Sequence, residues 1–229
     1  MKIFITRNLA ADSTFKNILT HAGFKVTGIS LVKFLERSFQ PIPDTDWLFF
    51  YSKNGVKFFF KQLKEANEFD PKLAAMGAGT AKMILEHGYE VDFIGKGSPN
   101  EIAKAFGKVA GRQRILFIRA ENSKMSVQNA LSADMLVSER IVYANHPIRN
   151  AYIPPHDILV FTSPLNATTY FKYNPIIPSQ KVYSLGPTTT ERLYELGLPT
   201  IFTAPQPSEE ELANFLLKNL IYDGKNSDF

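Results

Sequence analysis

The segment Asp46-Trp-Leu-Phe-Phe-Tyr-Ser52 recurs 111 positions later in the chain as Asp157-Ile-Leu-Val-Phe-Thr-Ser163. Each copy is a short apolar run that begins after an aspartate and ends at a serine. Such a run is typical of a strand buried on both faces of a parallel sheet, and the serine that follows it can cap a helix. The sequence therefore predicts the same strand-to-helix unit twice.

Further motifs repeat at nearly the same distance. Met76-Gly77-Ala-Gly-Thr80 matches Leu185-Gly186-Pro-Thr-Thr189 at 109 positions. Ser98-x-x-Glu101 and Ser208-x-x-Glu211 lie 110 positions apart, and both have the pattern of a capping box that opens a helix. Offsets that agree this closely indicate two copies of one α/β domain.

The N-terminal segment bears on how the two copies are arranged. Ile5-Thr6-Arg7 resembles Phe117-Ile118-Arg119, 112 positions later, yet it precedes Asp46 in the chain. The copies are either tandem halves divided near residue 112, or nested, with the N-terminal strands joined to the C-terminal copy. Two proline-interrupted segments favour nesting, because they resemble crossings between domains. We therefore expect a discontinuous lobe (1–33 and 153–229), an inserted lobe (45–142), and linkers (34–44 and 143–152) that form a two-segment hinge.

Short apolar runs alternate with amphipathic helical patterns along the whole chain. This alternation predicts an α/β fold in which helices cover parallel sheets. Asp12 and Ser13 can cap the first helix, and Gly23 can end it. The expected strands are Ile3–Ile5, Val26–Val32, Trp47–Tyr51, Leu73–Met76, Glu90–Phe93, Ile115–Ile118, Ile158–Phe161, Val182–Leu185 and Thr200–Phe202.

Composition excludes several classes of protein. The chain has 229 residues, 45% of them hydrophobic, which is enough to bury a core, and its formal charge of +4 selects no nucleic-acid partner. With 0 cysteines it can form no disulfide, thiolate metal site or cysteine nucleophile. The histidines have no metal-binding spacing and no phosphate loop occurs, so we expect no metal and no cofactor. Apolar runs are too short to span a membrane, and we expect a cytoplasmic protein.

Candidate site residues lie where predicted strands turn into helices. Ligands of open parallel sheets bind beyond the carboxyl ends of the strands, where helix N-termini present unpaired N–H groups to an anion. Four of the candidates, Ser52, Thr80, Ser163 and Thr189, would cap helices whether or not they bind a ligand. The candidates are Thr6, Arg7, Ser52, Asn54, Gly77, Thr80, Ser163, Gly186, Thr188 and Thr189.

The order and spacing of these motifs resemble those of the uroporphyrinogen-III synthase family. The most characteristic stretches are Thr162-Ser163-Pro164 and Gly186-Pro187-Thr188-Thr189, and the resemblance covers nearly the whole chain. It implies two flavodoxin-like lobes, each a parallel sheet with helices on both faces, in the nested arrangement. It also implies a monomer that needs no metal or cofactor.

The resemblance further implies an activity, a lyase that converts hydroxymethylbilane, a linear tetrapyrrole rich in carboxylates, to uroporphyrinogen III with loss of water. The candidate hydroxyls and nearby N–H groups would hold the substrate's carboxylates. Tyr143 matches a tyrosine of the family's Val-Tyr pattern, and it would hydrogen-bond the departing hydroxyl or steer the terminal ring. Asn145 stands where the family often has threonine, so that position is left open as a ligand.

Two other functions remain open at this point. A two-lobed protein that binds a small anion without catalysis would share the architecture. An α/β enzyme that uses a nucleotide is disfavoured, because Gly77-Ala-Gly79 lacks the third glycine of a dinucleotide-binding fingerprint.

Overall fold

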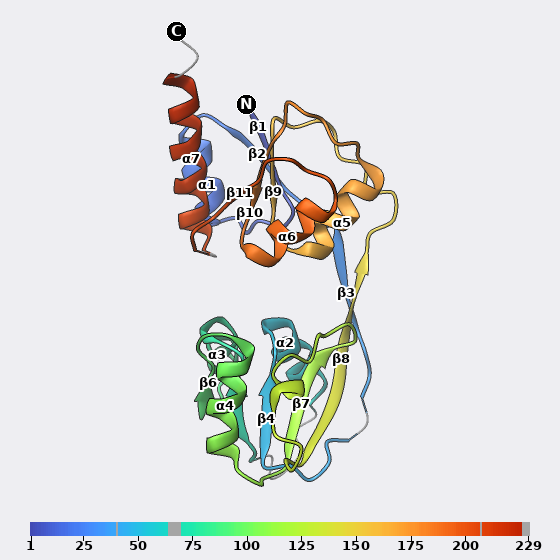
Figure 1. The fold of residues 1–229 in the computed structure, drawn as a ribbon. Helices are drawn as coiled ribbons and strands as arrows, with labels where there is room; N and C mark the ends of the chain where they lie inside the picture. The colour runs from blue at the N-terminus through green and yellow to red at the C-terminus, as the bar shows by residue number, and fades with distance from the viewer. Residues whose placement is uncertain (40, 64–69, 207, 226–229) are drawn as a thin grey trace. The chain divides into compact units, whose positions relative to one another are not determined.

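The computed structural model describes residues 1–39, 41–63, 70–206 and 208–225 (Figure 1). By its contacts the chain divides into two compact units. Unit 1 comprises Met1–Lys33 and His146–Phe229, and unit 2 comprises Phe34–Asn145. Each unit is built on its own sheet, one of five strands and one of six.

Unit 1 is a parallel sheet in the order β11-β10-β9-β1-β2. Strands from both ends of the chain therefore lie in one sheet, which is the nested arrangement. Its strands are β1 (Lys2–Ile5), β2 (Lys25–Gly28), β9 (Ile158–Phe161), β10 (Lys181–Ser184) and β11 (Phe202–Thr203). Its helices are α1 (Thr14–His21), α5 (Pro164–Tyr173), α6 (Pro187–Glu195) and α7 (Glu209–Lys225).

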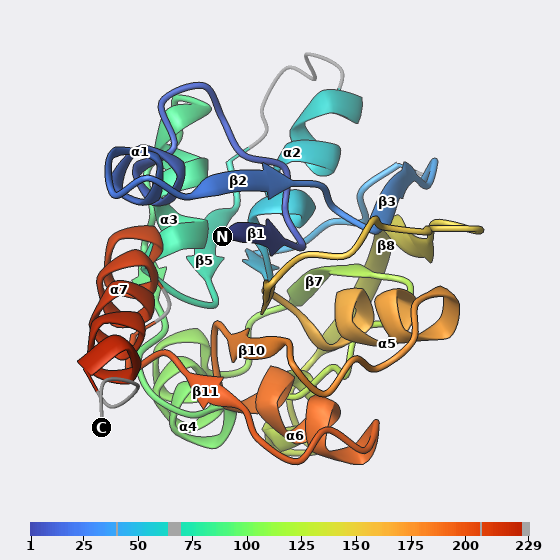
Figure 2. The same cartoon turned by 90° about the horizontal axis from the view of Figure 1, so that it is seen from above.

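Helices cover both faces of the unit 1 sheet, because alternate residues of each strand point to opposite sides. Ile3 and Ile5 of β1 pack with α1 and α7, whereas Phe4 between them packs with α5 and α6. Figure 2 shows these two pairs of helices on opposite sides of the strands. The expected parallel sheet flanked by helices is confirmed for this unit.

Unit 2 has the strand order β3-β8-β7-β4-β5-β6. The strands from β8 to β6 are parallel, whereas β3 runs opposite to β8: Arg37 N–H donates to the carbonyl of Val142, and Ile148 N–H donates to that of Leu31. The strands are β3 (Val32–Glu36), β4 (Trp47–Phe50), β5 (Lys72–Ala75), β6 (Phe93–Ile94), β7 (Ile115–Ala120) and β8 (Val137–Pro147). The helices are α2 (Lys53–Gln62), α3 (Ala78–Glu86), α4 (Pro99–Ala110) and the 3-10 turn η1 (Gln128–Ala130).

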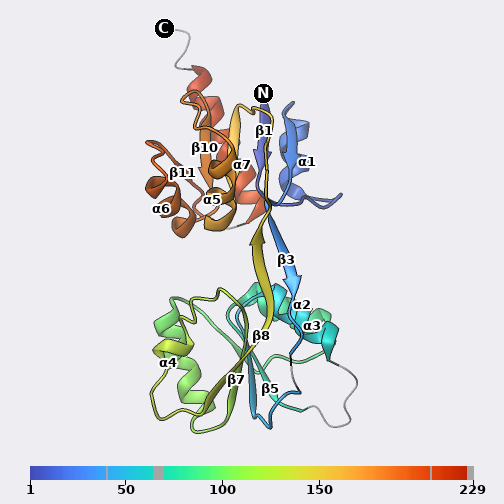
Figure 3. The ribbon, with the colours of Figure 1, turned by 90° about the vertical axis from the view of Figure 1, so that its right-hand side faces the viewer.

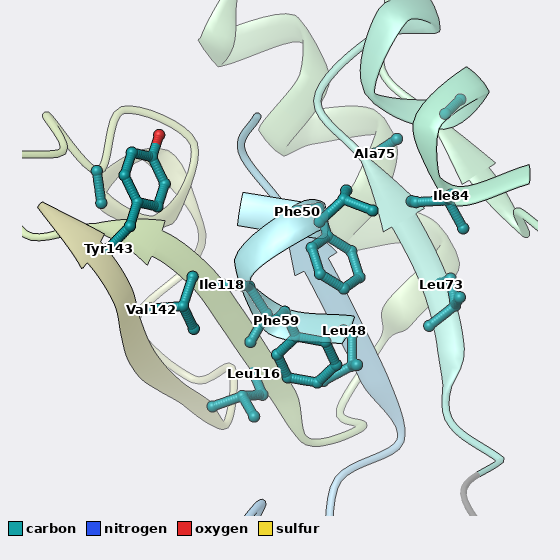
Figure 4. Close-up of a cluster of buried hydrophobic side chains, with 13 residues drawn as sticks. Leu48, Phe50, Phe59, Leu73, Ala75, Ile84, Leu116, Ile118, Val142 and Tyr143 are labelled. Atoms are coloured by element: carbon teal, nitrogen blue, oxygen red, sulfur yellow. The ribbon is translucent and has the colours of Figure 1, made fainter. Parts of the chain in front are cut away.

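The core of unit 2 also has two layers. Leu48 and Phe50 of β4 pack with α2 and α3, whereas Trp47 and Phe49 pack with α4 (Figure 3). Figure 4 shows the first of these layers, with the β4 and β7 side chains facing Phe59 of α2. Strands buried on both faces explain why the sequence here is a run of apolar residues instead of an alternation.

The pairing register reproduces the sequence repeat. Ile158 of β9 pairs with Ile3 of β1, and Trp47 of β4 pairs with Ile115 of β7. Trp47 and Ile158 are 111 positions apart, and Ile3 and Ile115 are 112 apart. The offsets read from the motifs are therefore those of structurally equivalent strands.

The capping residues predicted for three helices lie at the ends of those helices. Ser13, not Asp12, caps α1, and Gly23 beyond its end has a φ of +85°, which favours glycine. Ser98 and Glu101 form a complete capping box on α4. Ser208 accepts from the N–H of Glu211 at 3.2 Å at the start of α7.

Three expected strands need correction, and a further strand was not expected. The expected strand Val26–Val32 is two strands in different sheets, β2 and β3, separated at residues 29–31. The expected strands Glu90–Phe93 and Thr200–Phe202 begin only at Phe93 and Phe202. β8 was missed, because its charged residues and its terminal proline hide the pattern, and part of it was assigned to the linker 143–152. The other predicted linker, 34–44, contains the end of β3, and residue 40 lies outside the described residues.

No helix within the described ranges is long and apolar enough to cross a membrane.

The repeated aspartates brace the start of the central strands. A carboxylate oxygen of Asp46 accepts from the backbone N–H of Arg114 at 2.7 Å, and one of Asp157 accepts from that of Lys2 at 2.6 Å. Asp46 also binds the Arg114 guanidinium, with a distance of 3.0 Å between its Oδ1 and Nη2. These hydrogen bonds to Arg114 lower the pKa of Asp46 from 3.8 to about 2.

Replacing Asp46 with asparagine is expected to destabilise the protein in a pH-dependent way. The folded-state pKa is depressed, so the ionised carboxylate stabilises the fold above pH 3.8, and this contribution is lost as the pH falls towards about 2. The gap in urea midpoint between the parent and Asp46→Asn should therefore be constant near neutral pH and shrink below about pH 4. Asp12→Asn removes the same charge from an exposed position and serves as the control. A gap that does not change with pH would contradict this account.

Candidate functional site at the carboxyl ends of the strands

Each unit places a serine cap directly after its central strand. Ser52 caps α2 and accepts from Gly55 N–H at 3.0 Å, and Ser163 caps α5 and accepts from Asn166 N–H at 3.3 Å. Their backbones are nearly identical, with φ of −160° in both and ψ of 159° and 154°. The two serines are therefore equivalent positions of the repeat.

The next strand in each unit leads into a helix that no side chain caps. Gly77 precedes α3 and Gly186 precedes α6, and neither offers a side-chain acceptor. In α3 the N–H groups of Thr80 and Ala81 both donate to the carbonyl of Gly77. The first-turn amides before them have no partner inside the helix, so they are available to an anion.

Threonines accompany both uncapped helix starts. Thr80 of α3 and Thr189 of α6 are buried, with 7% and 3% of their surface exposed, whereas Thr188 in the first turn of α6 is exposed. Asn54, in the first turn of α2, is half-buried. The structure therefore groups the predicted residues of each unit at the carboxyl edge of that unit's sheet.

Tyr143 reaches the unit 2 edge from β8. Its hydroxyl oxygen lies 2.9 Å from Oγ of Ser52, within hydrogen-bonding distance. The phenol ring stacks on Phe58, with ring centres 5.4 Å apart, and lies 6.0 Å from the ring of Phe34. Figure 4 shows the hydroxyl pointing away from the apolar cluster to which the ring belongs. Burial raises the pKa of Tyr143, and the hydrogen bond with Ser52 lowers it in part.

The starts of α2 and α3 are side by side in unit 2. A Cβ atom at Gly79 would lie only 2.9 Å from Cε of Lys53 and 3.5 Å from its ammonium nitrogen. The Lys53 ammonium group therefore lies beside the uncapped first turn of α3. Two positive features in one place, a lysine and a helix N-terminus, suit a carboxylate.

An ion pair between a buried arginine and a partly exposed glutamate joins β7 to β8. Arg119 of β7, with 8% of its side chain exposed, binds Glu139 of β8 through two nitrogens at 2.6 and 2.8 Å. Its Nη1 donates to the carbonyls of Ala120 and Glu121. This pairing lowers the pKa of Glu139 and leaves Arg119 fully engaged inside the protein.

Two predicted residues of unit 1 also have partners within the protein, one buried and one partly exposed. Thr6 is fully buried; its hydroxyl accepts from Thr162 N–H at 3.0 Å and lies 3.3 Å from the carbonyl of Val160. Arg7 pairs with Glu209 at 3.2 Å, and the same carboxylate accepts from the hydroxyl of Ser13. These contacts tie β1 to β9 and to the start of α7, so both residues position the edge.

In the part of the chain that the structure describes, no group of three or more histidine, aspartate or glutamate side chains could hold a metal ion.

The chain was compared with known protein families and structures. Residues 4–214 match the family described as uroporphyrinogen-III synthase HemD. The chain belongs to the uroporphyrinogen-III synthase family.

This family member is similar to a curated protein and to two solved structures at 16% to 25% sequence identity. It is 25% identical over 230 residues to a protein of Methanocaldococcus jannaschii named "Putative uroporphyrinogen-III synthase", with 89% of this chain and 94% of that protein covered. Its fold is similar to a crystal structure of uroporphyrinogen-III synthetase from Helicobacter pylori, with a TM-score of 0.75, 22% identity, and 95% and 99% of the two chains covered. It also resembles a mutant uroporphyrinogen III synthase from the extremely thermophilic bacterium Thermus thermophilus, with a TM-score of 0.58, 16% identity, and 98% and 99% covered.

Sequence reasoning missed two features of this family member's unit 2 edge. Lys53 was not selected, because only the structure brings it beside Gly79, which is 26 positions away. The contact between Tyr143 and Ser52 spans 91 positions and depends on β8, which was itself missed.

Proposed function

We propose that this protein is a uroporphyrinogen-III synthase, which cyclises hydroxymethylbilane to uroporphyrinogen III with loss of water. The observation that carries the proposal is the duplicated pair of helix starts, one capped by serine and one uncapped. In a chain of this family, each unit thereby offers hydroxyl and N–H donors at the edge where α/β proteins bind ligands. A substrate with many carboxylates is the ligand that such donors suit.

The reaction needs a shaped site more than a strong acid or base. The terminal hydroxyl gains a proton as its carbon–oxygen bond breaks, so that water leaves and an azafulvene cation remains. The final pyrrole attacks this cation through its substituted carbon, which gives a spiro intermediate. The older carbon–carbon bond at that carbon then breaks, the ring reverses, a new bond forms at its other α-carbon, and loss of a proton restores the pyrrole. Without control of conformation the open chain closes to the other isomer, so holding the chain folded is the main catalytic task.

We propose carboxylate-binding residues for each unit by itself. In unit 1 they are Ser163, Gly186, Thr188 and Thr189, and in unit 2 they are Asn54, Gly77 and Thr80, together with Lys53. Thr6 and Arg7 were candidates from the sequence, but their side chains are engaged with Thr162 and Glu209, and we assign them to positioning. We further propose that the protein acts as a monomer in the cytoplasm, without a metal or cofactor.

Tyr143 is the proposed catalytic residue. Its hydroxyl is the polar end of a ring otherwise packed among apolar side chains, and its raised pKa keeps the phenol protonated at neutral pH. A protonated phenol can donate a hydrogen bond to the oxygen that leaves. That bond strengthens as the oxygen gains negative charge in the transition state.

The decisive experiment supplies the purified protein with freshly prepared hydroxymethylbilane, oxidises the products and separates the porphyrin isomers. We expect isomer III to dominate and to form faster than isomer I forms without protein. Isomer I alone, at the uncatalysed rate, would refute the synthase. Tight binding of the substrate with no isomer III would favour the alternative of a binding protein.

Tyr143→Phe is expected to lower kcat about tenfold or more, because it removes the hydroxyl and keeps the ring. Loss of one hydrogen bond costs about 1 kcal/mol, so the Tm should stay within about 4 °C of the parent. Initial rates of isomer III formation and a thermal unfolding curve check both parts. An unchanged kcat would reduce Tyr143 to a packing residue.

Thr188→Val is expected to raise KM about threefold to tenfold with little change in kcat, because it removes one donor to a carboxylate and keeps the backbone N–H. Tyr194→Phe is the matched control, since it removes an exposed hydroxyl from the other end of α6. Steady-state kinetics of both variants test the assignment. Equal KM values for Thr188→Val and the control would remove Thr188 from the site.

A further inference from the structure

We infer that Ser52 is a positioning residue that directs the hydroxyl proton of Tyr143, as the middle member of a hydrogen-bond chain that begins at the N-terminus of α2. The chain runs from Gly55 N–H to Ser52 Oγ and from the Ser52 hydroxyl to Tyr143 Oη. This inference rests on the proposed function for its catalytic consequence, whereas the hydrogen-bond chain can be tested without substrate.

The geometry allows one useful direction for the chain. Gly55 N–H donates to Ser52 Oγ at 3.0 Å, and Ser52 Oγ lies 2.9 Å from Tyr143 Oη. A hydroxyl can accept through its oxygen and donate its own proton at the same time. When Ser52 donates to Tyr143, the phenol keeps its own proton free for a second hydrogen bond, and that proton can point towards a ligand. In the opposite direction Tyr143 would donate its only hydroxyl proton to Ser52 and would have none for a ligand.

Aromatic packing fixes the position of the Tyr143 ring, whereas Ser52 affects only the direction of the hydroxyl proton. The ring of Tyr143 stacks on Phe58 and lies beside Phe34, and only 5% of the residue is exposed. These contacts do not depend on Ser52. Loss of the serine hydroxyl should therefore leave the ring in place and change only the hydrogen bonding of its oxygen.

The electrostatics agree with donation by Ser52. The phenolate form of Tyr143 is stabilised when a donor points at its oxygen, and the contact with Ser52 acts to lower the pKa against the effect of burial. The N–H groups at the start of α2 polarise the serine in the same sense, since they present the positive end of the helix dipole. Two neighbouring carboxylates are themselves paired: Glu121 with Arg37, and Glu36 with Lys61. The other ionisable side chains on α2 and β8 are Lys53, Lys57, Glu139, Arg140 and His146.

The repeat shows that a cap alone does not explain this arrangement. Ser163 occupies the equivalent position in unit 1 with the same backbone conformation, and its Oγ accepts from both the backbone and the side-chain amide of Asn166. In unit 2 the corresponding serine instead contacts a tyrosine from β8. The cap is common to both units, whereas the contact with a phenol is described only for unit 2.

The kinetic test uses Ser52→Gly, because glycine at a helix N-cap costs little stability while it removes the hydroxyl. We expect kcat to fall about tenfold with KM within twofold of the parent. In a Tyr143→Phe background the same substitution should have no further effect on kcat, and Ser52→Thr should restore most of the activity. Ser98→Gly removes the cap hydroxyl of α4 in the same unit and should match the parent.

Two kinetic outcomes would overturn the inference. If Ser52→Gly raised KM and left kcat unchanged, Ser52 would bind substrate directly. If its effect on kcat were as large in the Tyr143→Phe background as in the parent, Ser52 would act independently of the tyrosine.

A measurement without substrate separates this inference from the proposed function. Difluorotyrosine at position 143, whose phenol is more acidic than that of tyrosine, is titrated and followed by fluorine NMR. We expect its pKa to be higher in Ser52→Gly than in the parent, and to return in Ser52→Thr. An unchanged pKa would refute donation by Ser52 even if the protein made isomer III. A raised pKa in a protein that made no isomer III would uphold the chain and refute the function.

Discussion

The whole structure depends on one parallel strand in each unit that is buried on both faces. Trp47–Phe50 and Ile158–Phe161 have at most 1% of each residue exposed, and every other strand is placed relative to them. A strand without water on either side cannot continue past the sheet, because its next N–H and C=O groups need partners. At Ser52 and Ser163 the chain starts a helix instead, and the carbonyls of these serines accept the helical N–H groups of Val56 and Ala167. The donors that we assign to substrate binding are therefore a by-product of ending a buried strand.

Much of this fold could be predicted from residues alone, and the reasons are physical. The apolar runs of the central strands and the capping residues that follow them are local signals, so the sequence predicts β4 and β9 with nearly correct bounds and the starts of α2 and α5 with the correct capping serines. The 111- and 112-residue offsets of the sequence repeat also separate the paired residues of the two sheets. Equivalent strands must present equivalent side chains to the helices on both faces, which is why the offsets agree. β8 was missed because it lies next to the edge strand β3, where one face is only partly covered and charged residues are tolerated.

The candidate site was predictable in kind and less so in its particulars. Gly77–Thr80 and Gly186–Thr189 open helices as expected, but the prediction that Thr80 and Thr189 cap them is wrong, because the N-cap residues are Gly77 and Gly186, which have no side chain. In contrast, sequence could not show that the hydroxyl of Thr6 is used by Thr162, or that Arg7 is held by Glu209, because these partners lie more than 150 positions away. Long-range pairing decides whether a polar side chain at a strand end faces a ligand or a neighbour.

The nested topology constrains the order in which the protein can fold on the ribosome. β1 pairs with β9 through Ile3 and Ile158, so the sheet of unit 1 cannot close until more than two thirds of the chain has been synthesised. All the strands of unit 2 have been synthesised by residue 147, which is 11 positions before β9 begins at Ile158. Until β9 arrives, β1 and β2 present an unpaired edge, which is a template for mispairing with another chain. The short length of both strands and the lysines that begin them, Lys2 and Lys25, reduce this hazard during synthesis.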